Sequence, residues 1–319
     1  MLELQNPKSV KLYDQGGHGC LFYPGPTCDG KIEDAKYITK IHMSNTNQKN
    51  EIYVSEKIKK IKRFSQYFSP IISSCEIDLA EVDDKEIKKC DFIRENPRQN
   101  ASGKYMSTKT IYVPGISYAK YLKKDHSTSI VVEIYKKLLV AVKKLLQQGI
   151  YHYDIKTSNV IIKSTTNQPI VIDFGITMVP DEVNTDQQYK DAFYVYSTDY
   201  NPWPIDVIII SYLVQKYNLT INPKVAETDV DEMKKIIDIK VIELEMLYSK
   251  PLDKYKERRM TEVIQYLGMS CKEVVDVLKQ QYINWDKYSV AIMTQQIAQK
   301  YDIIFPHKIQ KQIESQIMY

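Results

Sequence analysis

The prevailing spacing of the apolar residues changes at Val113-Pro114-Gly115, and this change limits the folds that the chain can adopt. Before that turn, short runs rich in β-branched and aromatic residues predict strands. These runs are residues 9–15, 20–24, 36–42, 74–82 and 105–112. Residues 47–64 instead carry a face with three-to-four spacing, which predicts a helix. We expect the strands to form an antiparallel sheet with this one helix lying against it.

Beyond the Pro-Gly turn the pattern becomes helical. Ser127 or Thr128 can cap a helix that Gly149 ends. Its apolar face is predicted to contain Val131, Ile134, Leu138, Val142 and Leu145. We therefore expect an α+β protein with two lobes. Residues 1–113 would form a small antiparallel-sheet lobe with one helix, and residues 114–319 a larger, mainly helical lobe.

Composition excludes several classes of protein. Apolar stretches such as Val207 to Ile210 are much shorter than a bilayer requires, and residues 1–11 have no apolar signal core. Five scattered cysteines without a C-x-x-C pair predict neither a disulfide framework nor a zinc site, so we expect a reducing, cytoplasmic environment. The net charge is only +4 and few of the basic residues are arginines, which argues against direct nucleic-acid recognition. The polar stretch 83–103, which includes Pro97, predicts a loop before a strand.

The residues that can carry chemistry lie between His152 and Gly175. The segment His152-Tyr153-Asp154-Ile155-Lys156-Thr157-Ser158-Asn159 precedes one apolar run, and Asp173-Phe174-Gly175 follows a second. Two short strands would therefore present four polar side chains at neighbouring loop ends, namely Asp154, Lys156, Asn159 and Asp173. Phosphoryl transfer needs a carboxylate near the acceptor hydroxyl, oxygen ligands for Mg²⁺ and a cation for the migrating group. This segment supplies all three.

These motifs resemble the catalytic loop H-R-D-[LI]-K-x-x-N and the D-F-G motif of the protein kinase family. The resemblance implies a two-lobed fold that binds ATP and Mg²⁺ and phosphorylates serine or threonine hydroxyls of a protein substrate. Asp154 and Lys156 would be the catalytic residues, and Asn159 and Asp173 would hold the metal ion. The lysine two residues after Asp154 is typical of the serine/threonine class.

The resemblance extends into the amino-terminal part. Gly16, Gly17 and Gly19 lie between two predicted strands, where the family has its phosphate-covering hairpin, although Phe22 stands at the third glycine position. Lys40 ends an alternating strand and matches the lysine that contacts the α- and β-phosphates. A glutamate on the next helix should pair with it. Glu51 shares the apolar face of that helix, whereas Glu56 lies off it, so we expect Glu51 to be the partner.

The family's hinge should follow the last strand of the sheet. Thr110 would be the gatekeeper, and backbone groups at Ile111 and Val113 would meet the adenine ring. After Gly175 the match becomes looser, since no A-P-E motif follows and the nearest segment is Tyr200-Asn201-Pro202-Trp203-Pro204. The central helix of the large lobe could begin near Asp206 or near Asp286. The residue types around Asp286 favour the second.

Tyr153 replaces the family's arginine beside Asp154. A neutral phenol cannot bind a phosphate in bidentate fashion, so we expect activity without phosphorylation of the segment after Gly175. The divergent large lobe resembles kinases of large cytoplasmic DNA viruses, which would place the chain in the host cytoplasm or the virion. Two alternatives remain: a small-molecule phosphotransferase of the aminoglycoside or choline kinase type, and a pseudokinase scaffold.

Overall fold

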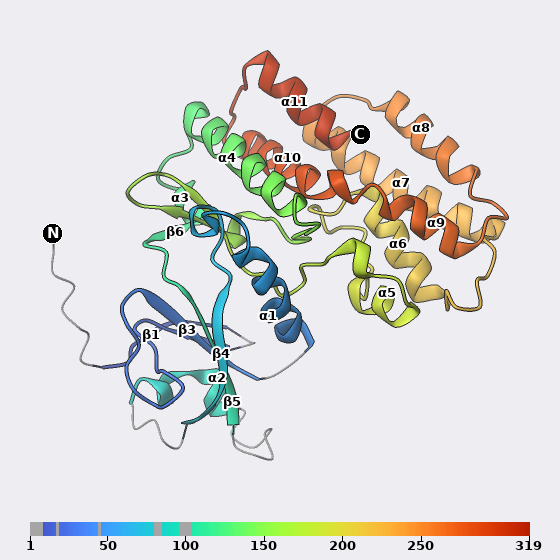
Figure 1. Cartoon of the computed structure of the whole chain (residues 1–319). Helices are drawn as coiled ribbons and strands as arrows, with labels where there is room; N and C mark the ends of the chain where they lie inside the picture. Colours follow the sequence, from blue (N-terminus) through green and yellow to red (C-terminus); the bar gives the residue numbers. More distant parts are fainter. Residues whose placement is uncertain (1–8, 17–18, 44–45, 80–84, 96–103) are drawn as a thin grey trace. The chain divides into compact units, whose positions relative to one another are not determined.

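The computed structural model describes residues 9–16, 19–43, 46–79, 85–95 and 104–319. The chain divides into two compact units. The first comprises residues 1–116 and 161–175, and the second comprises residues 117–160 and 176–319. The class is α+β, because a small antiparallel sheet occupies the first unit and most helices lie in the second (Figure 1).

The first unit is built on a five-stranded antiparallel sheet in the order β1-β2-β3-β5-β4. The strands are β1 (Leu12–Gly16), β2 (Gly19–Phe22), β3 (Tyr37–His42), β4 (Ile71–Asp78) and β5 (Lys104–Ile111). Helix α1 (Thr46–Lys59) packs against β4 and buries Val54 and Ile58. The predicted strands, their antiparallel pairing and the single long helix of this part are therefore confirmed, with ends shifted by up to a few residues.

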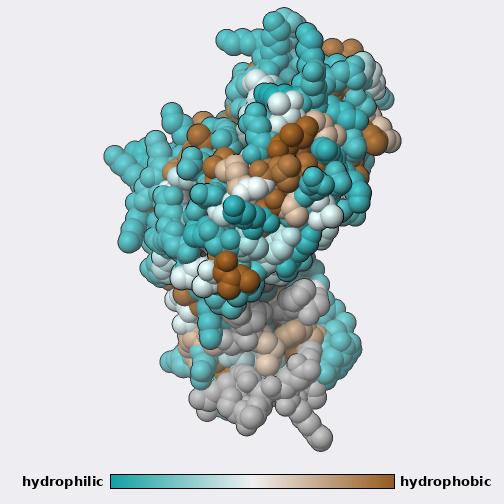
Figure 2. Space-filling view, turned by 90° about the vertical axis from the view of Figure 1, so that its right-hand side faces the viewer, coloured by the Kyte–Doolittle hydropathy of each residue, from teal (hydrophilic) through white to brown (hydrophobic). Residues whose placement is uncertain are grey.

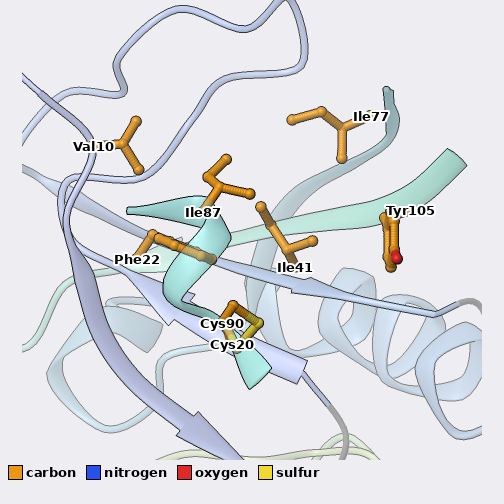
Figure 3. Close-up of a cluster of buried hydrophobic side chains, with 8 residues drawn as sticks. All are labelled: Val10, Cys20, Phe22, Ile41, Ile77, Ile87, Cys90 and Tyr105. Atoms are coloured by element: carbon orange, nitrogen blue, oxygen red, sulfur yellow. A yellow bond between two sulfur atoms is a disulfide. The ribbon is translucent and has the colours of Figure 1, made fainter. Parts of the chain in front are cut away.

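Apolar side chains on one face of this sheet form the core of the first unit (Figure 3). The cluster consists of Val10, Cys20, Phe22, Ile41, Ile77, Ile87, Cys90 and Tyr105. Burying an isoleucine or phenylalanine contributes about 1.5–3 kcal/mol, so this cluster is the main apolar support of the sheet.

The cysteines contradict the sequence-based expectation. Cys20 is bonded to Cys90, and Cys28 is bonded to Cys75, which leaves Cys271 as the free cysteine. Separations of 70 and 47 residues gave no recognisable spacing. The prediction that the chain has no disulfides was wrong, and the argument for a reducing compartment loses its basis.

The predicted loop 83–103 also contains structure. A 3₁₀ turn at Ile87–Lys89 leads into α2 (Asp91–Glu95). The segments before and after these elements, 80–84 and 96–103, lie outside the described residues. Ile87 and Cys90 reach the core in Figure 3, and Phe92 and Ile93 pack against it. The loop prediction failed because these few apolar residues are dispersed among charged ones and show no regular spacing. The disulfide of Cys90, which the sequence did not predict, reinforces their packing.

A strand pair that follows the segment 152–159 joins the first unit, which the predicted boundary at 113/114 did not anticipate. A second sheet has the order β6-β7-β8, with β6 (Gly115–Ser117), β7 (Val160–Lys163) and β8 (Pro169–Val171). Val171 donates its N–H to Tyr67 O (2.8 Å) and accepts from Ser69 N–H (3.1 Å). Gly115 allows close packing, because a Cβ there would lie 2.2 Å from Ile162 O. These contacts fix residues 161–175 to the sheet unit.

The second unit is helical. Its helices are α3 (Tyr118–Tyr121), α4 (Thr128–Leu146), α5 (Asp186–Ala192), α6 (Ile205–Lys216), α7 (Glu227–Tyr248), α8 (Asp253–Ile264), α9 (Cys271–Lys279), α10 (Tyr282–Lys300) and α11 (His307–Ile317). The predicted face of α4 is buried and Gly149 has a left-handed φ of 66°, as expected for a helix stop. Helix α10 lies beside α4 and α11 (Figure 1) and is buried nearly all round from Trp285 to Ala298.

The surface of the helical unit is mixed. Ile242 and Met246 of α7 remain exposed, and the face in Figure 2 shows brown apolar areas within a largely hydrophilic surface. Among the described residues, no helix combines the length and apolar character needed to span a bilayer.

Candidate functional site

A cavity of about 240 Å³ lies within the first unit. Most of its wall is aliphatic or aromatic, and the charged groups are one lysine and two carboxylates. The lining residues are Tyr13, Leu21, Ile38, Lys40, Glu51, Ser69, Ile71, Thr108, Thr110, Ile111, Tyr112, Val113, Ile161, Ile172 and Asp173. An apolar cavity with a few polar groups is the usual form of a small-molecule site.

The alternation of β3 explains why Lys40 reaches this cavity. Side chains two residues apart share a face of a strand, so Ile38 and Lys40 lie on the cavity side. Ile41 is fully buried on the opposite side, in the cluster of Figure 3. Lys40 pairs with Thr108 on β5, which also lines the cavity. The Lys40 ammonium group therefore lies among mainly apolar side chains in the wall of the cavity.

Glu51 and Asp173 meet Lys40 at this cavity. Burial raises the pKa of Glu51, and the nearby Asp173 carboxylate raises it further, whereas Lys40 and the backbone N–H of Phe174 lower it. Asn50, the neighbour of Glu51 on α1, donates from Nδ2 to Gly175 O at 3.2 Å. Asp173 has a left-handed φ of 66°, a conformation that a non-glycine residue adopts only when its surroundings hold it there.

Of the two glutamates on α1, the one on the predicted apolar face lies at the cavity. Glu51 lines the cavity, whereas Glu56 forms an ion pair with Lys59 at 2.6 Å and has a side chain that is 63% exposed. Glu51 therefore lines the same cavity as Lys40, and its pairing with that lysine stays a prediction.

The predicted hinge residues line the same cavity. Thr110 and Ile111 come from the end of β5, and Val113 follows two residues later. The carbonyl of Ile111 already accepts a hydrogen bond from Ser69 Oγ at 2.8 Å, which leaves one lone pair for a ligand. Tyr112 stacks on Tyr23 with ring centroids 3.7 Å apart, so an aromatic pair supports this segment.

The glycine-rich turn connects β1 and β2. Gly16 and Gly19 face each other in the register of this hairpin, and Gly17 lies outside the described residues. Gly19 has a positive φ of 142°, and a Cβ there would lie 2.5 Å from Ile41 O. Close packing on β3 therefore requires glycine at this position, whereas Gly16 has open space around it.

In the second unit, Asp154 is the centre of a hydrogen-bond network. Its Oδ2 accepts from Asn159 Nδ2 at 2.8 Å and forms an ion pair with Lys156 Nζ at 2.9 Å. Its Oδ1 accepts a hydrogen bond from the Tyr200 hydroxyl, which also lies 3.4 Å from Lys156 Nζ. Three of the predicted site residues are thus brought together, and both oxygens of the carboxylate are engaged.

Asp286 holds the backbone of this loop from α10. Its carboxylate accepts the N–H groups of His152 (2.8 Å) and Tyr153 (3.2 Å). Burial raises the pKa of Asp286 to about 7, although the two N–H donors act in the opposite direction. Asp206 instead pairs with Arg259 between α6 and α8. The structure therefore favours Asp286 as the aspartate of the central helix, as the local residue pattern suggested.

Tyr153 does not bond to Asp154 through its ring. The ring is buried and stacks on Trp203, with centroids 4.6 Å apart and an interplanar angle of 17°. Trp203 Nε1 also donates to the Tyr153 carbonyl at 2.8 Å. The loop and the segment 200–204 are therefore joined by aromatic packing and a hydrogen bond.

Sequence reasoning did not assign roles to Tyr200 and Trp203. The sequence pattern that could have indicated them is the dense group of aromatic and proline residues from Tyr200 to Pro204. This pattern indicates a rigid segment but does not predict which residues the segment contacts. Lys240, buried in α7, donates to the Tyr200 carbonyl at 3.4 Å, so this segment is also held from behind.

The Mg²⁺ site predicted from the sequence depends on two residues, Asn159 and Asp173, which belong to different units. Within the described ranges, no three His, Cys, Asp or Glu side chains gather as a metal site. The Asn159 amide nitrogen donates to Asp154, and its amide oxygen accepts a 3.4 Å hydrogen bond from Ser158 Oγ. The Asn159 amide oxygen and the Asp173 carboxylate are each oxygen donors of the kind that Mg²⁺ prefers.

We compared the chain with models of known protein families and with curated proteins, and neither comparison finds a match.

Proposed function

We propose that the chain is an Mg²⁺-ATP-dependent protein kinase that transfers the γ-phosphoryl group to serine or threonine hydroxyls. The observation that carries this proposal is the convergence of Lys40, Glu51 and Asp173 on one apolar cavity that also includes the predicted hinge. A chance arrangement would not explain why one lysine and two acids from β3, α1 and the segment after β8 meet at one mainly apolar cavity.

The cavity would bind the nucleotide. Its apolar walls suit the adenine ring, and the backbone at Ile111 and Val113 offers polar groups to the ring edge. Lys40 would neutralise charge on the α- and β-phosphates, with Glu51 holding its ammonium group in place. Asp173 would bind Mg²⁺ together with Asn159, and the ion would supply positive charge to the phosphate oxygens.

The loop in the second unit would handle the acceptor. Asp154 would accept a hydrogen bond from the substrate hydroxyl and take its proton as the oxygen attacks the γ-phosphorus and the bond to ADP breaks. Lys156, already 2.9 Å from Asp154, would stabilise charge on the phosphoryl group in transit. Asn159 Nδ2 donates to the Asp154 carboxylate at 2.8 Å and to the Asp154 backbone carbonyl at 3.0 Å, and so keeps this residue oriented. In this structure the Tyr200 hydroxyl occupies one carboxylate oxygen, so the acceptor must displace it or share that oxygen with it.

The test is an assay with labelled ATP, generic protein acceptors and phosphoamino-acid analysis. We expect labelled phosphoserine or phosphothreonine with the wild type and at least a 100-fold lower rate with Asp154→Asn, as for loss of a general base. Asp231→Asn is the matched control, since Asp231 is an exposed acid of α7 that pairs only with nearby Lys234. Labelling of aminoglycoside or choline with no protein labelling would identify a small-molecule phosphotransferase instead. Absence of transfer to either class would refute the proposal and favour a scaffold.

A further inference from the structure

A second cavity, of about 280 Å³, lies in the second unit beside the catalytic loop. Its walls come from the end of α3, from residues 155–157, from Pro202 and from the carboxyl end of α10. Lys156 belongs to this wall and also forms the ion pair with Asp154. The cavity therefore begins next to the carboxylate that would receive the acceptor hydroxyl.

The charge of this cavity is one-sided. Among the residues that the structure describes, Lys123, Lys156 and Lys300 line it, and no aspartate or glutamate does. Lys156 is compensated by Asp154, but within the described part of the chain neither Lys123 nor Lys300 has an ion-pair partner. Lys300 lies 5.6 Å from the centroid of the Tyr301 ring, a contact that leaves its positive charge in place.

The floor of the cavity is apolar. Buried side chains of Leu122, Ile155 and Ile297 line it, between the exposed lysines Lys123 and Lys300. A ligand that fills this cavity should therefore combine an aliphatic contact with negative charge. An extended acidic peptide has both properties, because alternate side chains can enter the cavity while the others meet the lysines.

We propose that this cavity binds acidic residues flanking the acceptor serine or threonine, so that the substrates are proteins with an acidic segment around the modified hydroxyl. The proposal rests on the proposed kinase function, because it takes Asp154 as the place of the acceptor. Lys123 and Lys300 are then specificity-determining residues that attract carboxylates without touching the reacting atoms.

The test uses the full chain and three peptides of equal length with one serine, flanked by glutamate, by glutamine or by lysine. We expect kcat/KM for the glutamate peptide to exceed that for the glutamine peptide by about 10-fold at low salt and to fall as salt screens the lysines. The double variant Lys123→Glu, Lys300→Glu should lose this preference and favour the lysine peptide, with kcat on the glutamine peptide unchanged. Lys124→Glu, an exposed neighbour outside the cavity wall, should behave as the wild type.

Binding of the same labelled peptides, measured by fluorescence anisotropy, separates this proposal from the kinase assignment. If the glutamate peptide binds best and the double variant weakens its binding at least 5-fold, the cavity binds acidic segments even without phosphoryl transfer. If the three peptides bind equally, or the double variant binds the glutamate peptide as the wild type does, the proposed binding of acidic segments is refuted. Phosphorylation of all three peptides at equal rates would then leave the kinase assignment standing.

Discussion

The cavity of the first unit and the Asp154 loop of the second unit are built in different ways. The cavity leaves space between apolar strands, and its three charged groups stand at its wall. In the loop, both oxygens of Asp154 are engaged by Lys156, Asn159 and Tyr200. An open cavity selects a ligand by shape and charge, whereas a fully bonded carboxylate is a positioned group. Substitutions in the first should therefore alter nucleotide binding, and those in the second should alter turnover or acceptor use.

The largest effect is expected for Lys40→Met, because the cavity would lose its only ammonium group and leave Glu51 and Asp173 to repel each other. We predict at least a 1000-fold loss of transfer, an order of magnitude known for charge-stabilising groups in phosphoryl transfer, with an unchanged far-ultraviolet circular dichroism spectrum. Single-turnover kinetics at saturating acceptor would measure it.

Glu51→Gln should reduce transfer less completely, and Glu56→Gln is its matched control on the same helix. Among the described residues, exposed Glu56 forms its ion pair with half-buried Lys59, so its substitution should change the rate less than twofold. A damaging Glu56→Gln beside a silent Glu51→Gln would mean that the cavity is not the site of Lys40 function.

The units should also differ in their response to reduction. The Cys20–Cys90 bond closes a long loop in the first unit, and the chain-entropy account gives it about 4–5 kcal/mol of unfolding free energy. The double variant Cys20→Ala, Cys90→Ala should lower protection from hydrogen exchange in β2 and α2. Helices α4 and α10 should keep theirs, since the described second unit has only the free Cys271. Equal loss of protection in both units would contradict this difference.

Tyr200→Phe should have a smaller effect, of the opposite sign. The Tyr200 hydroxyl competes with an acceptor for Asp154, and a hydrogen bond to a charged group contributes about 1.5–3 kcal/mol. We expect kcat/KM for the acceptor to rise about 3- to 10-fold and ATP affinity to stay constant. Tyr196→Phe, whose hydroxyl contacts only Glu232 at 3.5 Å, is the control. A rate that falls in Tyr200→Phe would show that this hydroxyl assists transfer.

The smallest effect should come from dephosphorylation. Trp203 and Tyr153 already join the loop to the segment 200–204, so no phosphate is needed for that contact. Phosphatase-treated and untreated enzyme should have the same initial rate on an exogenous substrate. The sites concerned are Thr177, Thr185, Tyr189, Ser197 and Thr198. A large drop that autophosphorylation at one of them restores would show that another cation performs the task of the missing arginine.

Local patterns predicted those parts of the structure that depend on neighbours in sequence. The two-residue alternation of a strand placed Lys40 and Ile41 on different faces of β3. Helical spacing placed Glu51 and Glu56 on different faces of α1. The contact of Asp286 with His152 spans 134 residues, and the sequence did not predict it. The residue types near Asp286 only favoured it over Asp206 as the start of the central helix.

The failures share one physical origin. The bond between Cys20 and Cys90 and the position of Tyr200 on Asp154 are set by tertiary packing, which leaves no periodic trace in the chain. The strand pair 161–175 joined the first unit for the same reason, since its hydrogen bonds to Tyr67 and Ser69 connect residues about one hundred positions apart. Sequence reasoning grouped Asp154, Lys156 and Asn159 correctly, but it did not predict Asp286 and Tyr200 as the partners that hold this loop.

The division of labour between cavity and loop is tested most directly by comparing Asp154→Asn with Asp173→Asn. Calorimetry would give the affinity of each variant for Mg²⁺-ATP, and single-turnover kinetics would give the rate of transfer. The account predicts that Asp154→Asn keeps the affinity within about threefold and loses at least 100-fold in rate, whereas Asp173→Asn loses metal-dependent affinity as well. An equal loss of nucleotide affinity in both variants would contradict it.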